Sequence, residues 1–277
     1  MKKIVILLML FWSGLTLGQS KLKNMTFIPA GEIILQDENS ADSREVKVSL
    51  RSFFISNEIT NKEFRTFVDY LKAHPDGNLE WVDLKSKPFE ELRKDLKSYI
   101  VSCKMADVLS NLIDTFAMAN EYPINSEEYT LYQNYFTDKK YDDYPVVGVT
   151  RQGAMYYCIW RTTIENNELM KKGKPTQMSY RLATLPEWYC AQQYCPGPSV
   201  KSSKVDNVKS QKVKKMEVPN MNGNVSEWIS SSNENGENIA MGNSWKSGDD
   251  KLLKTFKDKN VREGYIGFRI VKDSIYE

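Results

Sequence analysis

Two capping boxes constrain the fold of this 277-residue chain more than any other feature. In Thr60-Asn61-Lys62-Glu63 and in Thr184-Leu185-Pro186-Glu187, a threonine hydroxyl and a glutamate carboxylate are spaced to satisfy the free amide groups that open a helix. Thr150 is the expected N-cap of a further helix. The first box continues into a stripe of apolar residues at helical spacing, which ends near His74-Pro75: Phe64, Phe67, Val68 and Leu71. These signals predict three helix starts.

Short strand-like segments surround these helices. Met25–Leu35 predicts two strands that break at Pro29-Ala30-Gly31, and residues 45–55 are again strand-like. Tyr144–Val149 and Ile266–Val271 predict two more short strands. Short strands, irregular loops and a few capped helices predict an α+β fold rather than a doubly wound parallel sheet.

The first 18 residues have the pattern of a secretory signal peptide. Two lysines precede nine apolar residues, Ile4–Trp12, which are too few to span a bilayer and lead into a small-residue exit at Gly18. No cysteine occurs before Cys103, so the lipid-modified cysteine of a lipoprotein signal is missing. We therefore expect an exported protein with no direct membrane anchor, and one domain over residues 19–277.

Residues 76–143 carry less pattern, and we interpret them as a helical insert in this domain. Two sets of apolar residues keep helical spacing there: Phe89, Leu92, Leu96, Tyr99 and Cys103, then Met105, Leu109, Leu112 and Phe116. A polar, tyrosine-rich loop follows and runs to Asp143.

Charge and cysteine content exclude some partners and leave other questions open. Without the two lysines of the leader, the chain holds 36 basic and 36 acidic residues, which gives no electrostatic reason to expect nucleic acid. Lys201–Lys215 holds six lysines and no aromatic residue, which favours a solvated loop. The four cysteines allow up to two disulfides in three pairings: Cys103, Cys158, Cys190 and Cys195.

The sequence lacks the catalytic residue patterns that most enzyme classes need. His74 is the only histidine, so neither an HExxH zinc site nor a two-histidine iron site can be built. A Ser-His-Asp triad would need a GxSxG elbow, which this sequence lacks. The sequence also has no phosphate-binding glycine loop, so nothing in it supports nucleotide binding. One segment suits an ion: Asn220–Trp228 combines asparagine, a turn glycine and a glutamate, which are ligand types that calcium accepts. The alternative is an asparagine-rich turn that hydrogen-bonds its own backbone.

Seven blocks between residues 25 and 272 together resemble one known family. Asn220–Trp228 is similar to its N-x-x-G-N-V-W-E-W motif, and Arg181–Trp188 to its R-L-P-T-E-A-E-W motif. The other blocks are Phe27–Glu32, Phe53–Phe64, Tyr144–Trp160, Gly242–Trp245 and Ile266–Arg269. This is the formylglycine-generating enzyme domain, also called the sulfatase-modifying factor domain. The resemblance implies its α+β, C-type-lectin-related fold.

Within the family, the chain looks most similar to the gliding-motility lipoproteins of the type IX secretion machinery. Asn134–Phe136, Tyr141–Val149 and Trp160–Thr162 carry this resemblance. It implies an inactive family member in the periplasm or at the outer membrane, whose partners are other envelope proteins. The oligomeric state stays open.

The resemblance also implies which site residues to expect. Active members hold copper between two cysteines just after the G-G-S-F strand, but no cysteine follows Trp245 here. We therefore expect neither copper nor iron and no catalytic residue. Calcium is the cofactor that remains, with ligands from four residues: the Asn220 side chain, the Gly223 and Val225 carbonyls, and the Glu227 carboxylate. Three further charged residues are expected as buried structural ion partners: Arg181, Glu187 and Arg269.

The leading hypothesis is a non-catalytic binding or scaffold protein whose residues 76–143 and 201–216 recognise partners. The first alternative is a copper-dependent oxidase of a substrate cysteine, which would require Cys190 and Cys195 to fold against Gly242–Trp245. The second is a carbohydrate- or peptide-binding module, which would expose an aromatic cluster near Tyr129–Tyr144.

Overall fold

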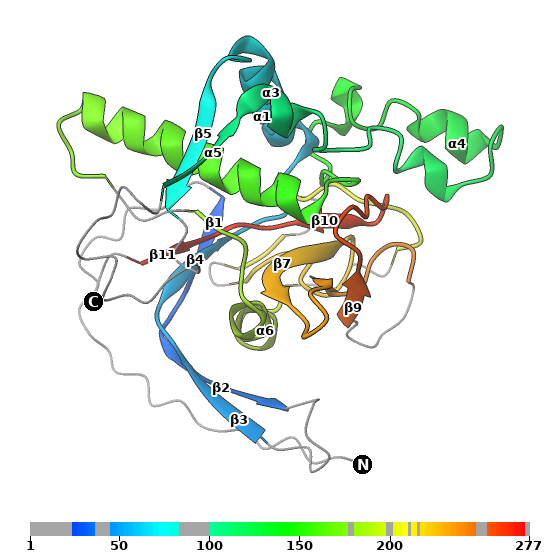
Figure 1. Cartoon of the computed structure of the whole chain (residues 1–277). Coiled ribbons are helices and arrows are strands. Elements are labelled where there is room, and N and C mark those ends of the chain that lie inside the picture. Colours follow the sequence, from blue (N-terminus) through cyan, green and yellow to red (C-terminus); the bar gives the residue numbers. More distant parts are fainter. Residues whose placement is uncertain are drawn as a thin grey trace, which may run out of the picture.

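The computed structural model describes residues 24–36, 45–82, 100–176, 180–197, 202–209, 212–214, 217–247 and 254–274. Runs of short strands near both ends of the chain flank a mainly helical middle part (Figure 1), which confirms the predicted α+β fold. The helices are α1 (Asn61–Ala73), α3 (Met105–Leu109), α4 (Glu127–Tyr132), α5 (Arg151–Lys171) and α6 (Leu185–Tyr194), with short turns η2 (Ala119–Glu121) and η3 (Lys139–Tyr141). The strands are β1 (Met25–Ile28), β2 (Gly31–Gln36), β3 (Glu45–Leu50), β4 (Phe53–Ser56), β5 (Asn78–Val82), β6 (Ile100–Lys104), β7 (Ser226–Ser232), β8 (Asn238–Met241), β9 (Lys254–Lys257), β10 (Ile266–Phe268) and β11 (Val271–Asp273). The predicted leader and the expected helix over Phe89–Tyr99 lie outside these residues.

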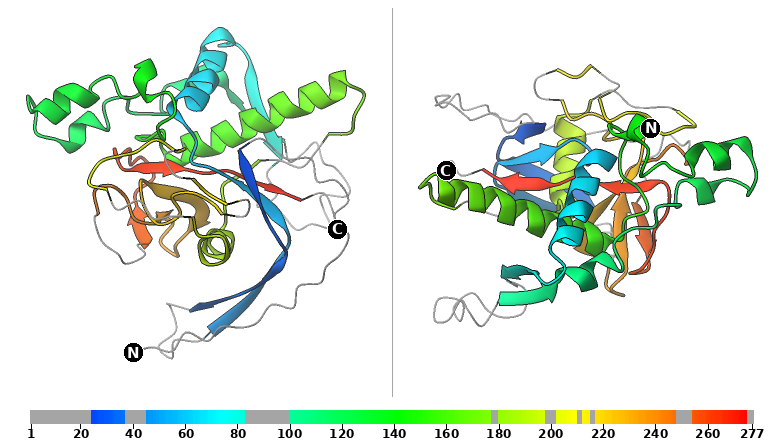
Figure 2. Two further views of the ribbon diagram at one scale, coloured as in Figure 1. Left: turned by 180° about the vertical axis from the view of Figure 1, so that it is seen from behind. Right: turned by 90° about the horizontal axis from the view of Figure 1, so that it is seen from above.

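Two small sheets share the C-terminal segment of the chain. One is antiparallel in the order β1-β4-β11, and the other has the order β10-β7-β8-β9. β10 runs parallel to β7, with Ile266 opposite Ser226 and Phe268 opposite Trp228. The chain then passes from one sheet to the other between β10 and β11 (Figure 2), which places Arg269 at the junction of the two sheets.

The three predicted helix starts are confirmed. Thr60 and Thr184 both form complete capping boxes, and Thr150 accepts a hydrogen bond from the backbone N–H of Gly153. Each such cap contributes about 1 kcal/mol. α1 ends at Ala73, immediately before His74.

The largest hydrophobic cluster lies where α1 and α5 pack over the sheets. Phe64 of α1 is fully buried and stacks on Tyr157 of α5, with ring centroids 5.8 Å apart. The edge of Phe64 also meets Phe268 of β10 at 6.0 Å. A second cluster surrounds Trp188 of α6, and a third joins several tyrosines to Trp245. Burial of each such aromatic side chain stabilises the fold by about 2–3 kcal/mol.

Three parts project from this body. The ribbon β2–β3 pairs Gly31 with Leu50 through to Gln36 with Glu45, and the ribbon β5–β6 pairs Asn78 with Lys104. Residues 114–143, which we call the tyrosine arm, carry η2, α4 and η3 to one side of the molecule (Figure 1). None of the helices in the described part of the chain combines the length and apolar character that a membrane crossing requires.

Four local predictions differ from the structure. Cys103 lies on β6 opposite Leu79, not on a helix, because pairing with a distant strand overrides the helical spacing around it. The helix expected over 105–116 ends at Leu109. Residues 144–149 make only two isolated bridges, through Pro145 and Val149, since proline has no N–H to extend a ladder. The strand expected over 266–271 is split into β10 and β11 at Arg269.

Candidate functional site

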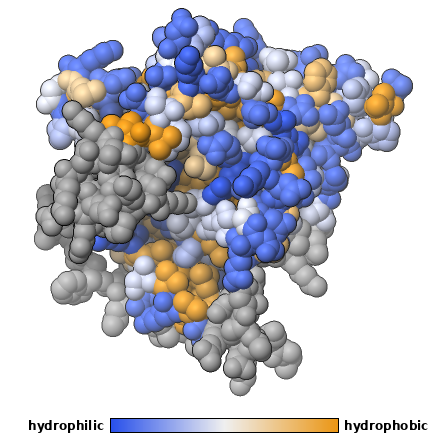
Figure 3. All heavy atoms as spheres, in the orientation of Figure 1, coloured by the Kyte–Doolittle hydropathy of each residue, from blue (hydrophilic) through white to orange (hydrophobic). Residues whose placement is uncertain are grey.

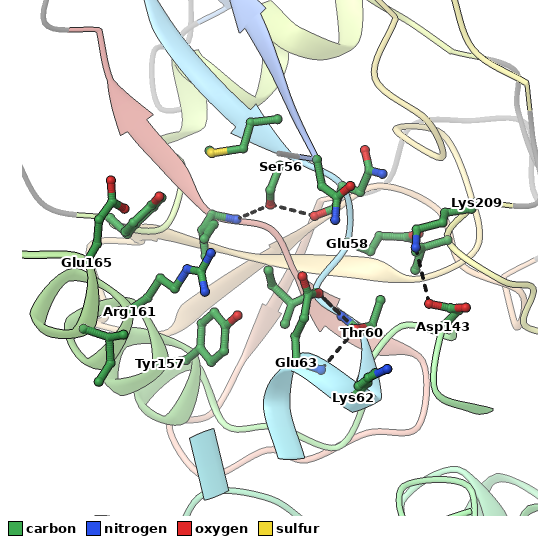
Figure 4. Close-up of a pocket in the computed structure, with 18 of the residues that line it drawn as sticks. Ser56, Glu58, Thr60, Lys62, Glu63, Asp143, Tyr157, Arg161, Glu165 and Lys209 are labelled. Carbon is green, nitrogen blue, oxygen red and sulfur yellow. Dashed lines mark hydrogen bonds and ion pairs between the residues drawn. The ribbon is translucent and has the colours of Figure 1, made fainter. Parts of the chain in front are cut away.

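A pocket of about 550 Å³ opens between α5 and the loop that leads into α1 (Figure 4). Tyr157, Arg161 and Glu165 follow one another at every fourth position of α5, so all three line the same wall. The helix runs for 21 residues because its Thr150 cap fixes its start and Lys172 bonds back to Glu168 and Leu169 at its end.

The opposite wall is the segment from Ser56 to Glu63. The Glu63 carboxylate accepts hydrogen bonds from the backbone N–H of Thr60 at 3.0 Å and from its hydroxyl at 3.0 Å. The Thr60 hydroxyl in turn accepts from the Glu63 N–H. This capping box therefore holds the Glu63 side chain in a fixed position at the pocket. Figure 4 shows it pointing toward the side of the pocket where Arg161 lies.

Glu58 lies at the pocket floor and is almost completely buried. Its carboxyl group accepts hydrogen bonds from the amide of Asn220 at 2.7 Å and from that of Asn224 at 3.0 Å. Burial raises the pKa of Glu58 to about 8, although the nearby Arg269 and the two amides act in the opposite direction and Glu227 acts in the same one. A buried carboxyl group thus connects the pocket to the loop that the sequence singled out.

That loop places its two asparagines in the left-handed region, with φ values of 60° at Asn220 and 66° at Asn224. Asparagine tolerates this conformation better than most residues because its short side chain bonds locally. Asn220 is fully buried, and its Oδ1 atom has no hydrogen-bond partner in the part of the chain that the structure describes. Gly223 and Val225, the expected carbonyl ligands, are buried in the same loop.

The carboxylate of Glu227 has two protein partners. Oε1 accepts from Arg269 Nε at 2.6 Å, and Oε2 accepts from the indole N–H of Trp188 at 2.8 Å. Arg269 also donates to the carbonyls of Pro219 at 2.7 Å and Ser56 at 3.1 Å. Burial raises the pKa of Glu227, and Arg269 and Trp188 oppose that rise. Arg269 therefore joins both sheets to the Asn220–Trp228 loop.

The four expected calcium ligands fit the ion only in part. The unpartnered oxygen of Asn220 suits a hard cation, which needs six to eight oxygen ligands. The carboxylate of Glu227 does not, because a buried guanidinium already supplies its positive charge. Among the described residues, no three His, Cys, Asp or Glu side chains gather in a way that would hold a metal ion. Calcium stays a prediction, and we derive no function through it.

The described residues just after Gly242 offer no sulfur ligand for copper. Lys246 follows Trp245, and its ammonium group pairs with Glu121 of the tyrosine arm at 2.5 Å and lies 4.8 Å from the ring centre of Tyr265. Trp245 stacks on Tyr122 of the arm at 5.6 Å. Residues of the arm thus pack where active family members are expected to hold copper, and no thiolate is present there.

All four cysteines are free thiols in the structure. Cys190 and Cys195 belong to the hydrophobic cluster around Trp188, whereas Trp245 belongs to the tyrosine cluster. Burial raises the pKa of Cys190 to about 11, and the neighbouring Cys195 and Glu187 add to the rise. The copper-oxidase alternative required these two cysteines to fold against Gly242–Trp245, and Trp245, at the end of that segment, belongs to a different cluster.

The tyrosines between 129 and 144 do not form an exposed aromatic cluster. Tyr132, Tyr135 and Tyr141 are buried, and Tyr135 donates to the carbonyl of Pro145 at 2.8 Å. Tyr129 and Tyr144 are half-buried. These rings hold the arm together, so the surface that the carbohydrate-binding alternative expected is absent from these residues.

The remaining charged residues of the motifs are structural. Arg181 pairs with both oxygens of Glu187 at 2.7 Å and with Asp273 at 2.5 Å. Glu187 is buried and also closes the second capping box, while Arg181 is half-buried.

The sequence reasoning missed Glu58 and Arg161. Glu58 stands two residues before a capping box, which is the signal that would have placed it beside α1.

The family assignment rests on a match along nearly the whole chain. The model of the sulfatase-modifying factor enzyme 1-like domain family matches residues 16–199 and 192–274. The chain belongs to this family. No curated protein sequence matches it.

The chain is similar to several solved structures at low sequence identity. CarF has a TM-score of 0.51 and 14% identity, over 90% of this chain and 98% of CarF. PvdO from Pseudomonas aeruginosa has a TM-score of 0.49 and 16% identity, over 90% and 94% of the two chains. Treponema denticola variable protein 1 has 0.48 and 15%, over 90% and 95%. At these identities, the likeness to CarF extends to the fold alone.

Proposed function

We propose that the protein is a non-catalytic binding or scaffold component of the bacterial cell envelope. The observation that carries this proposal is the contact between the tyrosine arm and the segment after Gly242. Lys246 pairs with Glu121, and the Glu121 carboxylate also accepts from the backbone N–H of Gly264 at 2.8 Å. The arm engages this segment through an ammonium group and an indole, and no cysteine follows Trp245 to supply the sulfur ligands that copper redox chemistry would need.

The arm also supports a binding role. Its inner side is fixed by stacked tyrosines, while Ile124 is 75% exposed and Leu131 is 47% exposed. Figure 3 shows apolar side chains at the tip of this projection, next to hydrophilic ones. A rigid base and an exposed apolar tip are typical of protein contacts, since loops on a stable scaffold commonly carry recognition.

We place the protein in the periplasm or at the outer membrane, in contact with subunits of a type IX secretion or gliding machinery. The signal-peptide pattern of residues 1–18 and the resemblance of Asn134–Phe136 and Tyr141–Val149 to gliding-motility lipoproteins support this placement.

Affinity purification from cross-linked envelopes of the source organism tests the proposal. The tagged full-length chain is expected to recover secretion-machinery subunits, and Ile124→Asp at the arm tip is expected to weaken that recovery. Ile34→Asp, on the exposed face of the β2–β3 ribbon, is the matched control because Ile34 is also a surface isoleucine. Recovery of no envelope subunit by the unaltered chain would contradict the proposal.

A further inference from the structure

The pocket beside α5 has the size and lining of a ligand site. Its volume of about 550 Å³ lies within the range of roughly 300–1,000 Å³ that is usual for ligand pockets. Tyr157, Ile164, Tyr180 and Ile270 supply apolar and aromatic lining from α5 and from the segments beneath it. An apolar side chain of a ligand can therefore pack against this lining.

Most of the acidic groups in this pocket are already engaged. Five carboxyl groups line it: Glu58, Glu63, Asp143, Glu165 and Glu168. Glu58 and Glu63 accept the hydrogen bonds described above. Glu165 pairs with the buried Lys272 at 2.5 Å, and Asp143 pairs with Lys209 at 3.4 Å. The Glu168 carboxylate forms no hydrogen bond or ion pair with other residues that the structure describes.

The basic groups, in contrast, are mostly unpaired. Lys62, Arg161 and Lys172 line the pocket and form no ion pair with any residue that the structure describes. The Arg161 guanidinium lies 5.9 Å from the ring centre of Tyr180, a cation–π contact that positions it in the pocket wall. Glu63 has no cationic partner either, because its hydrogen bonds come from neutral groups, and burial raises the pKa of Glu58 to about 8. Three unpaired cations therefore face two unpaired carboxylates, Glu63 and Glu168, which leaves a small excess of positive charge in the pocket.

We propose that this pocket binds a peptide carboxylate, with Arg161 as its anchor and the apolar lining covering the adjacent side chain. The planar guanidinium can donate two parallel hydrogen bonds to a carboxylate, and Lys62 adds charge from the opposite wall. A singly charged group suits the pocket better than a phosphate, because Glu168 and the engaged acids repel a multiply charged anion. This inference rests on the proposed binding function and names one contact by which it would act.

Isothermal titration calorimetry with three probes tests the chemistry. N-acetyl-leucyl-glutamate amide presents a side-chain carboxylate, N-acetyl-leucyl-leucine a terminal carboxylate, and N-acetyl-leucyl-glutamine amide neither. At least one acidic probe is expected to bind about tenfold more tightly than the neutral one. Whichever acidic probe binds identifies the source of the carboxylate. Equal binding of all three, or no binding of any, would overturn the inference.

Two variants of α5 locate the site. Arg161→Gln is expected to weaken the acidic probe about tenfold and to leave the neutral one unchanged. Lys171→Gln alters an exposed residue of the same helix that does not line the pocket, and it is expected to bind normally. Equal affinities for Arg161→Gln and the unaltered protein would refute the assignment. If Arg161→Gln still recovers envelope subunits, the proposed function stands and the pocket is not its contact.

Discussion

Replacing Arg269 with methionine removes the cation that holds the two sheets to the Asn220–Trp228 loop. Arg269 is 1% exposed and donates to Glu227 at 2.6 Å and to two backbone carbonyls. Methionine fills much of the same volume, so the loss is chiefly one of charge and hydrogen bonds. Breaking a buried ion pair by removing one partner costs about 3–5 kcal/mol. At roughly 2–4 °C per kcal/mol for a domain of this size, the melting temperature should fall by about 10 °C.

Urea unfolding followed by tryptophan fluorescence measures this loss, because Trp188 is buried in direct contact with Glu227. The double variant Glu227→Gln with Arg269→Met should recover part of the loss, since a neutral amide no longer leaves an unpaired buried charge. Glutamine also keeps an oxygen for the Trp188 indole. A loss below about 1 kcal/mol in the single variant, or no recovery in the double variant, would refute the buried network.

Three further predictions concern Glu58, the calcium ligand Asn220 and the cysteine thiols. Because the folded protein keeps a proton on Glu58 that the unfolded chain releases near pH 4.5, its free energy of unfolding should fall between about pH 4.5 and about pH 8; Glu58→Gln should remove that part of the fall, and an unchanged pH profile would contradict this. Calcium, which the resemblance predicts and the unpartnered Asn220 oxygen suits, should raise the melting temperature relative to EDTA, and Asn220→Ala should abolish that rise; an unchanged melting temperature in millimolar calcium would contradict the predicted site. At pH 8 a thiol reagent should modify the half-buried Cys103 quickly and Cys190 only on unfolding, because burial raises the pKa of Cys190 to about 11; a disulfide found by mass spectrometry would contradict the free thiols.

Local signals in the sequence predicted the local structure well. The capping boxes at Thr60 and Thr184 and the cap at Thr150 marked helix starts because the cap residues satisfy amide groups only a few residues away. The break between the first two strands at Pro29-Ala30-Gly31 was likewise encoded by adjacent residues. The resemblance to the family also predicted the fold class.

Contacts between distant segments could not be predicted in the same way. Cys103 keeps helical spacing with its neighbours, yet β6 forms because Val101 pairs with Trp81. Glu227 was expected as a calcium ligand, and the loop alone did not show that its partner is Arg269, 42 residues away in sequence. The sequence could not predict the pocket for the same reason. Glu58 and Arg161 line one pocket only because α1 packs against α5.

Mass spectrometry of a cysteine-containing peptide incubated with the copper-treated protein in air tests the absence of catalysis most directly. The account predicts an unchanged peptide, because Lys246 and Trp245 are held by the tyrosine arm and no cysteine follows them in the sequence. Conversion of the peptide cysteine to formylglycine would contradict it and restore an oxidase function.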